Sequence, residues 1–366
     1  MNAALISQGS VSSKWTLEAM KKYFDDVDAI DIRELEVNLT PTKPEILYKG
    51  KHLNKYDCIY AKGSFRYASV LNAITVAYER NCYMPVKHSA FTIAHDKLLT
   101  QLDLQMHNIP MPKTYIAATK EAARKILENV NYPIIMKFLQ GTHGKGVMFA
   151  DSFNSATSIL DALVALSQPF IIQEYIDTQG TDIRAIVVGD RVVAAMKRIA
   201  APGEERANIH SGGSGKRIEL DAYTRRIAIK AAKAIGADIC GVDILQSIKG
   251  PFVLEVNISP GLPGVTEATK IDVADEIAKF LAKKTKERMS KEKEAEAGRI
   301  MKDLEFEQSG KKIERLNELF TNLEFRGERI LLPEVVTKIT SFNEDDEFVI
   351  TADKNKIVIK KFKLTK

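Results

Sequence analysis

The segment GVDILQSIKGPFVLEVNISPGLPG occupies residues 241–264. Its two apolar runs, VDIL and FVLEV, flank a Lys-Gly-Pro turn and predict an antiparallel hairpin. In this prediction Asp243 begins the first strand. Glu255 and Asn257 stand two residues apart on the second strand, so their side chains project from the same face. We therefore expect this face of the hairpin to carry three oxygen-donating side chains.

Three oxygen donors within apolar strands indicate a cation site. Carboxylates are costly to bury unless a cation compensates their charge. Because the segment itself contains no Cys or His, the donors suit Mg²⁺, which keeps part of its coordination sphere for substrate phosphates. The alternative is that Asp243, Glu255 and Asn257 are surface positions of an amphipathic hairpin. The Ser-Pro-Gly-Leu-Pro-Gly segment that follows cannot continue a strand and is typical of a functional loop.

Composition predicts a cytoplasmic protein with anionic substrates. The 366 residues are enough for two or three domains, and the net charge of +5 suits nucleotides or acidic peptides without indicating nucleic-acid binding. No apolar run approaches the roughly 20 residues of a membrane span, and the N-terminus lacks signal-peptide features. Cys58, Cys82 and Cys240 are widely spaced, so we expect reduced packing residues rather than ligands or a nucleophile.

The first 95 residues predict a small α/β layer, in which apolar strands alternate with helices. The expected strands cover residues 3–7, 29–32 and 57–61, and the expected helices cover 13–24 and 69–79. A glycine-rich fingerprint of the dinucleotide-binding type is absent from the sequence.

Lys137 interrupts the apolar strand PIIMKFL, residues 133–139. A lysine in a buried strand indicates an anionic ligand nearby, or else an edge strand with a snorkelling side chain. The segment QGTHGKGV then places three glycines in six residues. Such a loop lets backbone amides approach phosphate oxygens, although a plain hairpin loop has the same pattern, and no Walker motif is present.

A second hairpin is predicted at IRAIVV-GD-RVVAAMKR, with its turn at Gly189-Asp190 and with Arg184 and Lys197 contributing positive charge. RANIHSGG, residues 206–213, has no core-forming pattern and predicts a mobile substrate loop. A helix over 223–235 should end at Gly236, and Asp272 should cap another helix.

Taken in order, MKFLQGTHGKGV, QEYI, GTDIRAIVVGDRVVAAMKR, RANIHSGG, GVDIL and LEVNISPGL resemble the motifs of the ATP-grasp ligases. Within that family they are similar to the ribosomal protein S6 glutamate ligase (RimK-like) branch, over about residues 1–285. The resemblance implies a mixed α/β (α+β) protein with a pre-ATP-grasp α/β domain at 1–95 and an ATP-grasp domain at 96–285.

The resemblance also implies a role for each matching residue. Lys97 and Lys137 match the nucleotide-binding lysines, and Arg206 and Asn208 match positions near the transferred phosphoryl group, so Lys137 and Arg206 are the implied catalytic residues. Asp182 matches the ribose contact, and Asp243, Glu255 and Asn257 match ligands of Mg²⁺ (or Mn²⁺). The phosphate-covering flap and the adenine-facing hinge are matched by Gly141, Thr142, His143, Gly144, Lys145, Gly146 and Val147, and by Glu174, Tyr175 and Ile176.

The implied chemistry is ATP-dependent amide formation through an acyl phosphate. The substrates would be an amino-acid donor, glutamate or similar, and a carboxylate acceptor on a peptide, protein tail or cofactor. No protein nucleophile is required. We expect replacement of Asp243 or Glu255 to abolish ligation and leave the fold largely intact. The alternative is a nucleotide-sensing regulatory protein whose C-terminal domain binds a partner or DNA.

The C-terminal part departs from this resemblance. Residues 286–312 are rich in Lys, Glu and Arg and predict an exposed helix or linker. Residues 313–366 predict a small, mostly β domain after a short helix that carries Ile313, Leu316, Leu319, Phe320 and Leu323. Its pattern is similar to the swapped-hairpin domains of AbrB type, which implies a homo-oligomer formed by strand exchange and, less directly, nucleic-acid binding. A tethering or oligomerisation module without nucleic acid is the favoured alternative.

Overall fold

The computed structural model describes residues 1–42, 44–139, 146–200, 214–308, 324–327, 329–332, 336, 340, 342–343, 346–353 and 356–361. The chain divides into two compact units, residues 1–297 and 298–366. Within the described residues, no helix has the length and apolar character needed to cross a membrane.

The N-terminal region contains the predicted α/β layer. Its parallel sheet has the strand order β2-β1-β6, and its alternation of strands with α1 and α2 confirms the expectation. The elements are β1 (Asn2–Ser7), β2 (Asp26–Asp31), β6 (Cys58–Ala61), α1 (Val11–Met20), α2 (Ala68–Tyr78) and α3 (His88–Ile93). An antiparallel sheet that the sequence pattern did not predict joins β3 (Leu35–Leu39), β4 (Pro44–Tyr48) and β5 (Lys51–His52).

A second layer carries the strand that contains Lys137. Its antiparallel sheet has the order β7-β10-β8-β9, and α5 and α6 supply Leu127 and Leu160 to a core with Met136 and Ile172. Helix α4 comes before this sheet in the chain. Asp96 caps the N-terminus of α4 by accepting hydrogen bonds from the backbone amides of Leu98 and Leu99. The elements are α4 (Lys97–Met106), β7 (Thr114–Tyr115), α5 (Lys120–Asn129), β8 (Ile134–Phe138), β9 (Val147–Ala150), α6 (Phe153–Ala165) and β10 (Phe170–Glu174).

The largest sheet is antiparallel and contains both predicted hairpins. Its order is β13-β12-β11-β14-β15, with β11 (Thr181–Val188), β12 (Arg191–Ile199), β13 (Ser214–Arg217), β14 (Ile239–Ser247) and β15 (Gly250–Asn257). The turn at Gly189-Asp190 lies where it was predicted. The turn of the other hairpin is formed by Ile248 and Lys249, because Gly250 already pairs with Ser247, so the expected Lys-Gly-Pro turn is wrong. Strand β14 begins at Ile239, because residues 239–242 already pair with β11. Asp243 therefore lies inside the strand, and the expectation that it begins the strand is wrong.

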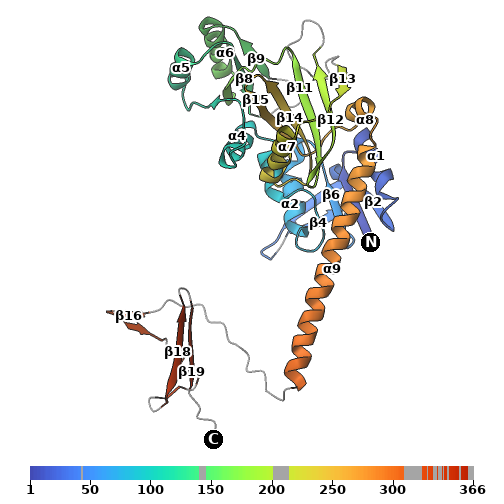
Figure 1. The fold of residues 1–366 in the computed structure, drawn as a ribbon, viewed down its shortest axis with the longest axis vertical. Helices are drawn as coiled ribbons and strands as arrows, with labels where there is room; N and C mark the ends of the chain where they lie inside the picture. Colours follow the sequence, from blue (N-terminus) through green and yellow to red (C-terminus); the bar gives the residue numbers. More distant parts are fainter. Residues whose placement is uncertain are drawn as a thin grey trace. The chain divides into compact units, whose positions relative to one another are not determined.

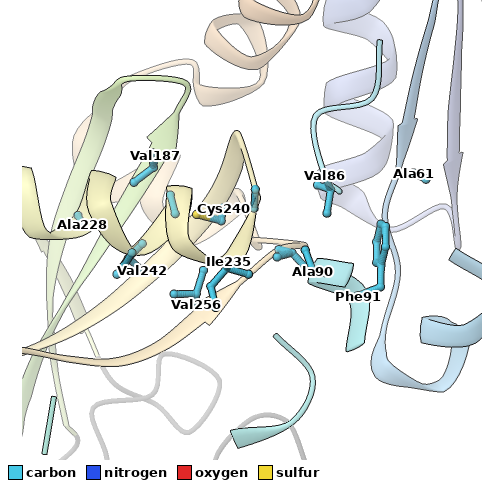
Figure 2. Close-up of a cluster of buried hydrophobic side chains, with 14 of the residues drawn as sticks. Ala61, Val86, Ala90, Phe91, Val187, Ala228, Ile235, Cys240, Val242 and Val256 are labelled. Carbon is cyan, nitrogen blue, oxygen red and sulfur yellow. The ribbon is translucent and has the colours of Figure 1, made fainter. Parts of the chain in front are cut away.

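Both faces of this sheet are buried along part of its length. On β11, Ala185 and Val187 belong to a core that includes α7 (Ala222–Ile235), whereas Ile186 and Val188 belong to a second core. The second core includes α8 (Pro263–Thr269), the start of α9 (Val273–Gln308) and residues of β1 and β6. Figure 1 shows the elements, and Figure 2 shows Ile235 of α7 and Val242 of β14 among the side chains of the first core.

Helix ends follow local rules in the described residues. Gly236 ends α7 in the left-handed conformation, at φ 81°, which an L side chain rarely adopts. Asp272 accepts from the backbone amide of Asp275 and caps α9 as expected. The charged segment predicted over 286–312 is helical as far as Gln308.

In the second unit the described strands form two separate hairpins. Strand β16 (Glu324–Arg326) pairs with β17 (Arg329–Leu331), and β18 (Phe348–Asp353) pairs with β19 (Lys356–Lys361). The small strand module that the sequence predicts is therefore present. Its AbrB-type assembly stays a prediction.

Candidate active site

Five charged side chains share one face of the largest sheet. Asp182 lies opposite Arg198 on β11 and β12, Arg184 lies opposite Asp243 on β11 and β14, and Asp243 lies opposite Glu255 on β15. Residues directly opposite in an antiparallel pair point to the same face. The pairing thus assembles a buried charged cluster from two hairpins, β11–β12 and β14–β15, that are well separated in sequence.

An irregularity in β15 places Glu255 on this face. The register between β14 and β15 shifts after the Asp243–Glu255 pair, because Ile244 pairs with Val253 rather than with Leu254. Val253 packs in the α7 core on the other face. The extra residue, Leu254, therefore lets Val253 face the apolar core while Glu255 faces Asp243.

Asp243 is held by two arginines. Its carboxylate accepts from Arg184 Nε at 2.7 Å and Nη2 at 2.6 Å, and from Arg198 Nη2 at 2.8 Å. Burial acts to raise the pKa of Asp243, but these two guanidinium groups hold it well below its ordinary value. The two arginines therefore stabilise the ionised form of Asp243.

Glu255 has the opposite character. Burial raises its pKa, and the neighbouring Asp243 carboxylate raises it further. Asn257, two residues on, pairs with Gly241, and its Oδ1 accepts from the backbone amide of Ser259 at 3.0 Å. Among the described residues, no three His, Cys, Asp or Glu side chains lie close enough together to hold a metal ion by themselves, so a cation here would rely on two carboxylates and one carboxamide. This all-oxygen set suits Mg²⁺, and a divalent cation would favour the ionised form of Glu255.

Lys137 and Lys97 reach the same cluster from other elements. Lys137 on β8 is 8% exposed and donates to Gln173 Oε1 at 2.6 Å. Burial lowers its pKa to about 8, opposed by the charge of Glu255. Lys97, at the start of α4, also has a pKa lowered by burial and opposed by Glu255. Both lysines therefore interact electrostatically with a carboxylate of the largest sheet.

The predicted adenine-facing and ribose-facing residues lie on or next to β10 and β11. Glu174, Tyr175 and Ile176 end and follow β10, and the Tyr175 ring meets Phe149 edge-on with ring centroids 5.4 Å apart. Asp182 accepts from Arg198 Nε at 2.5 Å and Nη2 at 2.7 Å, and burial raises its pKa to about 6.

The flap is described only at its end. Val147 begins β9, and Gly146 precedes it at φ 77°, where a Cβ would lie 2.1 Å from the Phe138 ring. The remaining predicted residues, Gly141, Thr142, His143, Gly144, Lys145, Arg206 and Asn208, lie outside the described residues.

Two contributors were missed from sequence. Lys197 was predicted to contribute positive charge in place of its neighbour Arg198, but Lys197 is exposed on the opposite face of the sheet. No local signal was available, because an unbroken register from the Gly189-Asp190 turn would pair Asp182 with Lys197. The register shift between Ile186 and Val187 moves the pairing by one residue and places Arg198 opposite Asp182. Gln173, the partner of Lys137, likewise carried no signal.

Residues 94–281 match the family model of the RimK-like ATP-grasp domain. The chain belongs to this family. It is 38% identical over 291 residues to the probable α-L-glutamate ligase 2 of Pseudoalteromonas atlantica, covering 78% of this chain and 97% of that protein. It is 37% identical over 283 residues to the probable α-L-glutamate ligase of Vibrio cholerae, covering 76% of this chain and 94% of that protein.

Solved structures of ATP-grasp ligases share the fold. The ligase PsnB, complexed with minimal precursor, Mg and ADP, has a TM-score of 0.61 at 18% identity and covers 78% of this chain and 98% of that chain. The RimK domain protein of Sphaerobacter thermophilus has a TM-score of 0.60 at 18% identity and covers 77% of this chain and 99% of that chain. The predicted ATP-grasp fold is confirmed.

This RimK-like chain is accordingly an ATP-grasp carbon–nitrogen ligase. The prediction of a ligase is confirmed, and the comparisons give no support to the alternative of a nucleotide-sensing regulatory protein. The roles of individual residues stay predictions.

Proposed function

We propose that this ligase uses ATP and Mg²⁺ to join the amine of glutamate, or a similar amino acid, to a carboxylate of a peptide, protein tail or cofactor. The curated relatives named as probable α-L-glutamate ligases support the amino acid. The relative PsnB, solved with precursor peptide PsnA2 and AMPPNP, supports a peptide acceptor.

The observation that carries this proposal is the charge arrangement around Glu255. Glu255, one of a buried carboxylate pair with Asp243, interacts electrostatically with Lys97 and Lys137. Phosphoryl transfer depends mainly on positioning and on neutralising the phosphate oxygens, and this arrangement would provide both a divalent cation and two ammonium groups.

Asp243, Glu255 and Asn257 would hold Mg²⁺, with Mn²⁺ as an alternative. The bound cation would neutralise phosphate charge and orient the phosphates for in-line transfer. Lys137 would hold its ammonium against phosphate oxygens, since Gln173 already fixes the direction of its side chain. Arg206 and Asn208 are proposed to contact the transferred group.

In the proposed reaction an acceptor carboxylate oxygen attacks the γ-phosphorus of ATP, and the bond to the β–γ bridging oxygen breaks to release ADP. The amine then attacks the acyl carbon of the acyl phosphate. Phosphate leaves, the nitrogen loses a proton, and an amide remains. The flap of residues 141–147 would cover the phosphates, Glu174 to Ile176 would meet adenine, and Asp182 would contact the ribose.

The proposed cellular setting rests on composition, and the proposed assembly rests on the resemblance of residues 313–366 to AbrB-type domains. We propose a cytoplasmic homo-oligomer assembled through residues 313–366, with no membrane partner and with nucleic acid not favoured as a partner. Mass spectrometry tests the central reaction: the chain is incubated with ATP, Mg²⁺, single amino acids and cell extract. We expect an acceptor whose mass increases by glutamate residues, together with one ADP for each amide formed. ADP release without any amide product would contradict the proposal.

A further inference from the structure

Lys62 is a buried lysine that the proposed reaction leaves without a role. It follows strand β6, is 4% exposed, and its Nζ lies 5.6 Å from the centroid of the Tyr60 ring. Within the part of the chain that the structure describes, this Nζ has no hydrogen-bond partner. An enclosed ammonium without an acceptor is costly and is rarely kept for packing alone.

The environment of Lys62 is dominated by burial. Burial lowers the pKa of Lys62 to about 8, and no described carboxylate acts against that shift. This separates Lys62 from Lys97 and Lys137, whose charges are both coupled to Glu255. Lys62 therefore lies beyond the immediate electrostatic reach of the carboxylate pair.

Hydrogen bonds nevertheless tie this position to the active site. The Lys62 backbone amide donates to Ile6 O at 2.9 Å, and the amide of the next residue, Gly63, donates to Ser259 Oγ at 3.0 Å. The Ser259 amide donates in turn to Asn257 Oδ1 at 3.0 Å. The end of β6 is thus linked through one serine to a predicted ligand of Mg²⁺.

The fold gives this position a second feature of a ligand site. Lys62 stands at the carboxyl end of a parallel strand, where ligands of open α/β sheets bind. Its neighbour Tyr60 belongs to the same core as Ile186 and Met196, which lie on the charged face of the largest sheet. Lys62 thus approaches the active-site face from the N-terminal sheet.

We propose that Lys62 binds a carboxylate of the amino acid that supplies the amine, an inference that rests on the proposed ligase reaction. The acceptor carboxylate must lie against the γ-phosphate, near Lys137, and it loses its charge on activation. A dicarboxylic amino acid keeps both carboxylates throughout the reaction and needs a cation away from the phosphates. Arg184 and Arg198 are already engaged by Asp243, whereas Lys62 offers an unused ammonium.

Steady-state kinetics of Lys62→Met, Lys62→Arg and the control Lys51→Met test this inference. Lys51 is an exposed lysine on β5 of the same unit. We expect Lys62→Met to raise the KM for glutamate about 10- to 100-fold, as for the loss of a buried charged hydrogen bond. The KM for ATP should stay within about twofold of wild type, because the nucleotide lysines are intact. Lys62→Arg should restore part of the glutamate affinity, and Lys51→Met should match wild type.

Two amide analogues identify the carboxylate. Glutamine lacks the γ-carboxylate and isoglutamine lacks the α-carboxylate, so the wild type should discriminate most strongly against the analogue that leaves Lys62 unpaired. Lys62→Met should lose that discrimination.

If the wild type ligates glutamate but Lys62→Met keeps both its glutamate KM and its discrimination, the inference is overturned while the ligase proposal stands. If the wild type forms no amide with glutamate, the ligase proposal fails and this inference fails with it. Should Lys62→Met not fold, a Lys62→Arg variant with a much raised KM for ATP would also contradict the inference.

Discussion

Asp243 and Glu255 lie directly opposite each other on β14 and β15, yet their carboxylates are in different electrostatic states. Asp243 accepts hydrogen bonds from Arg184 and Arg198, which keep its pKa low, whereas burial and Asp243 itself raise the pKa of Glu255. Two adjacent carboxylates with separated pKa values have different roles. Asp243 anchors the arginines in addition to its proposed part in holding the cation, and Glu255 is the group whose charge a bound cation would stabilise most.

We predict that Asp243→Ala destabilises the fold. Removing this carboxylate leaves two guanidinium groups, one of them 6% exposed, without their shared acceptor. Breaking a buried ion pair in this way costs about 3–5 kcal/mol. The expectation from sequence, that the fold stays largely intact, does not take these arginines into account. Denaturant unfolding measures the effect, with Asp190→Ala at an exposed turn as the control. A loss below about 1 kcal/mol would contradict the structural role of Asp243.

Lys137→Met should impair ATP use while leaving the fold intact. The variant removes a buried ammonium but retains the volume of the side chain, so we expect the midpoint of thermal unfolding to stay close to that of the wild type. Loss of one charge from the phosphates should lower kcat/KM for ATP about 100-fold or more. Lys197→Met, at an exposed position on β12, is the matched control. Equal kcat/KM for ATP in both variants would exclude Lys137 from the nucleotide site.

The burial of Lys62 makes the free energy of unfolding depend on pH in a defined direction. Its pKa is lowered from 10.5 to about 8 in the folded state, so between these values the unfolded chain binds more protons. Stability of the wild type should therefore rise with pH across this window. Lys62→Met should be more stable than wild type below about pH 8, and the difference should shrink toward pH 10.5. Thermal unfolding between pH 7 and pH 10.5 measures it, with Lys51→Met as reference. A difference that is constant with pH would show that Lys62 is not a buried ammonium.

The sequence predicted most elements of the nucleotide region because their signals are local. The turn at Gly189-Asp190, the stop at Gly236 and the cap at Asp272 each depend on a few adjacent residues. The bulge at Leu254 could not be predicted, since it depends on which residues of β14 pair with β15. Strict alternation would have placed Val253 and Glu255 on the same face.

The N-terminal region was harder to predict for a similar reason. Strand β3 does alternate apolar and polar residues, as LEVNL, but β5 has only two residues, so no hydrophobic pattern continues through all three strands of this sheet. The burial of Lys62 could not be predicted from the sequence, because a lysine after a buried strand is usually solvated. Its enclosure becomes apparent only when β6 packs beside β1 and Gly63 meets Ser259.

A chain truncated after Ala297 should remain a folded, active ligase. Residues 1–297 form a compact unit. The match to the relative from Pseudoalteromonas atlantica includes 97% of that protein but only 78% of this chain. The second unit has exposed apolar side chains on its described strands, including Ile330, Val349 and Ile350, and two-stranded hairpins are marginal alone. We therefore expect truncation to reduce the oligomer without affecting ATP binding. Light scattering gives the mass, and the same oligomer in both proteins would exclude the tail as the assembly element.

Amide formation by Glu255→Gln tests the central claim most directly. The substitution keeps the shape of the side chain and relieves the repulsion with Asp243, so the variant should fold with at least wild-type stability. Without the Glu255 charge, the oxygen set that would hold Mg²⁺ has one carboxylate instead of two. We predict that ADP release and amide formation with ATP, Mg²⁺ and glutamate fall together by about 100-fold or more. A folded Glu255→Gln protein that forms amide at the wild-type rate would contradict the assignment of this site.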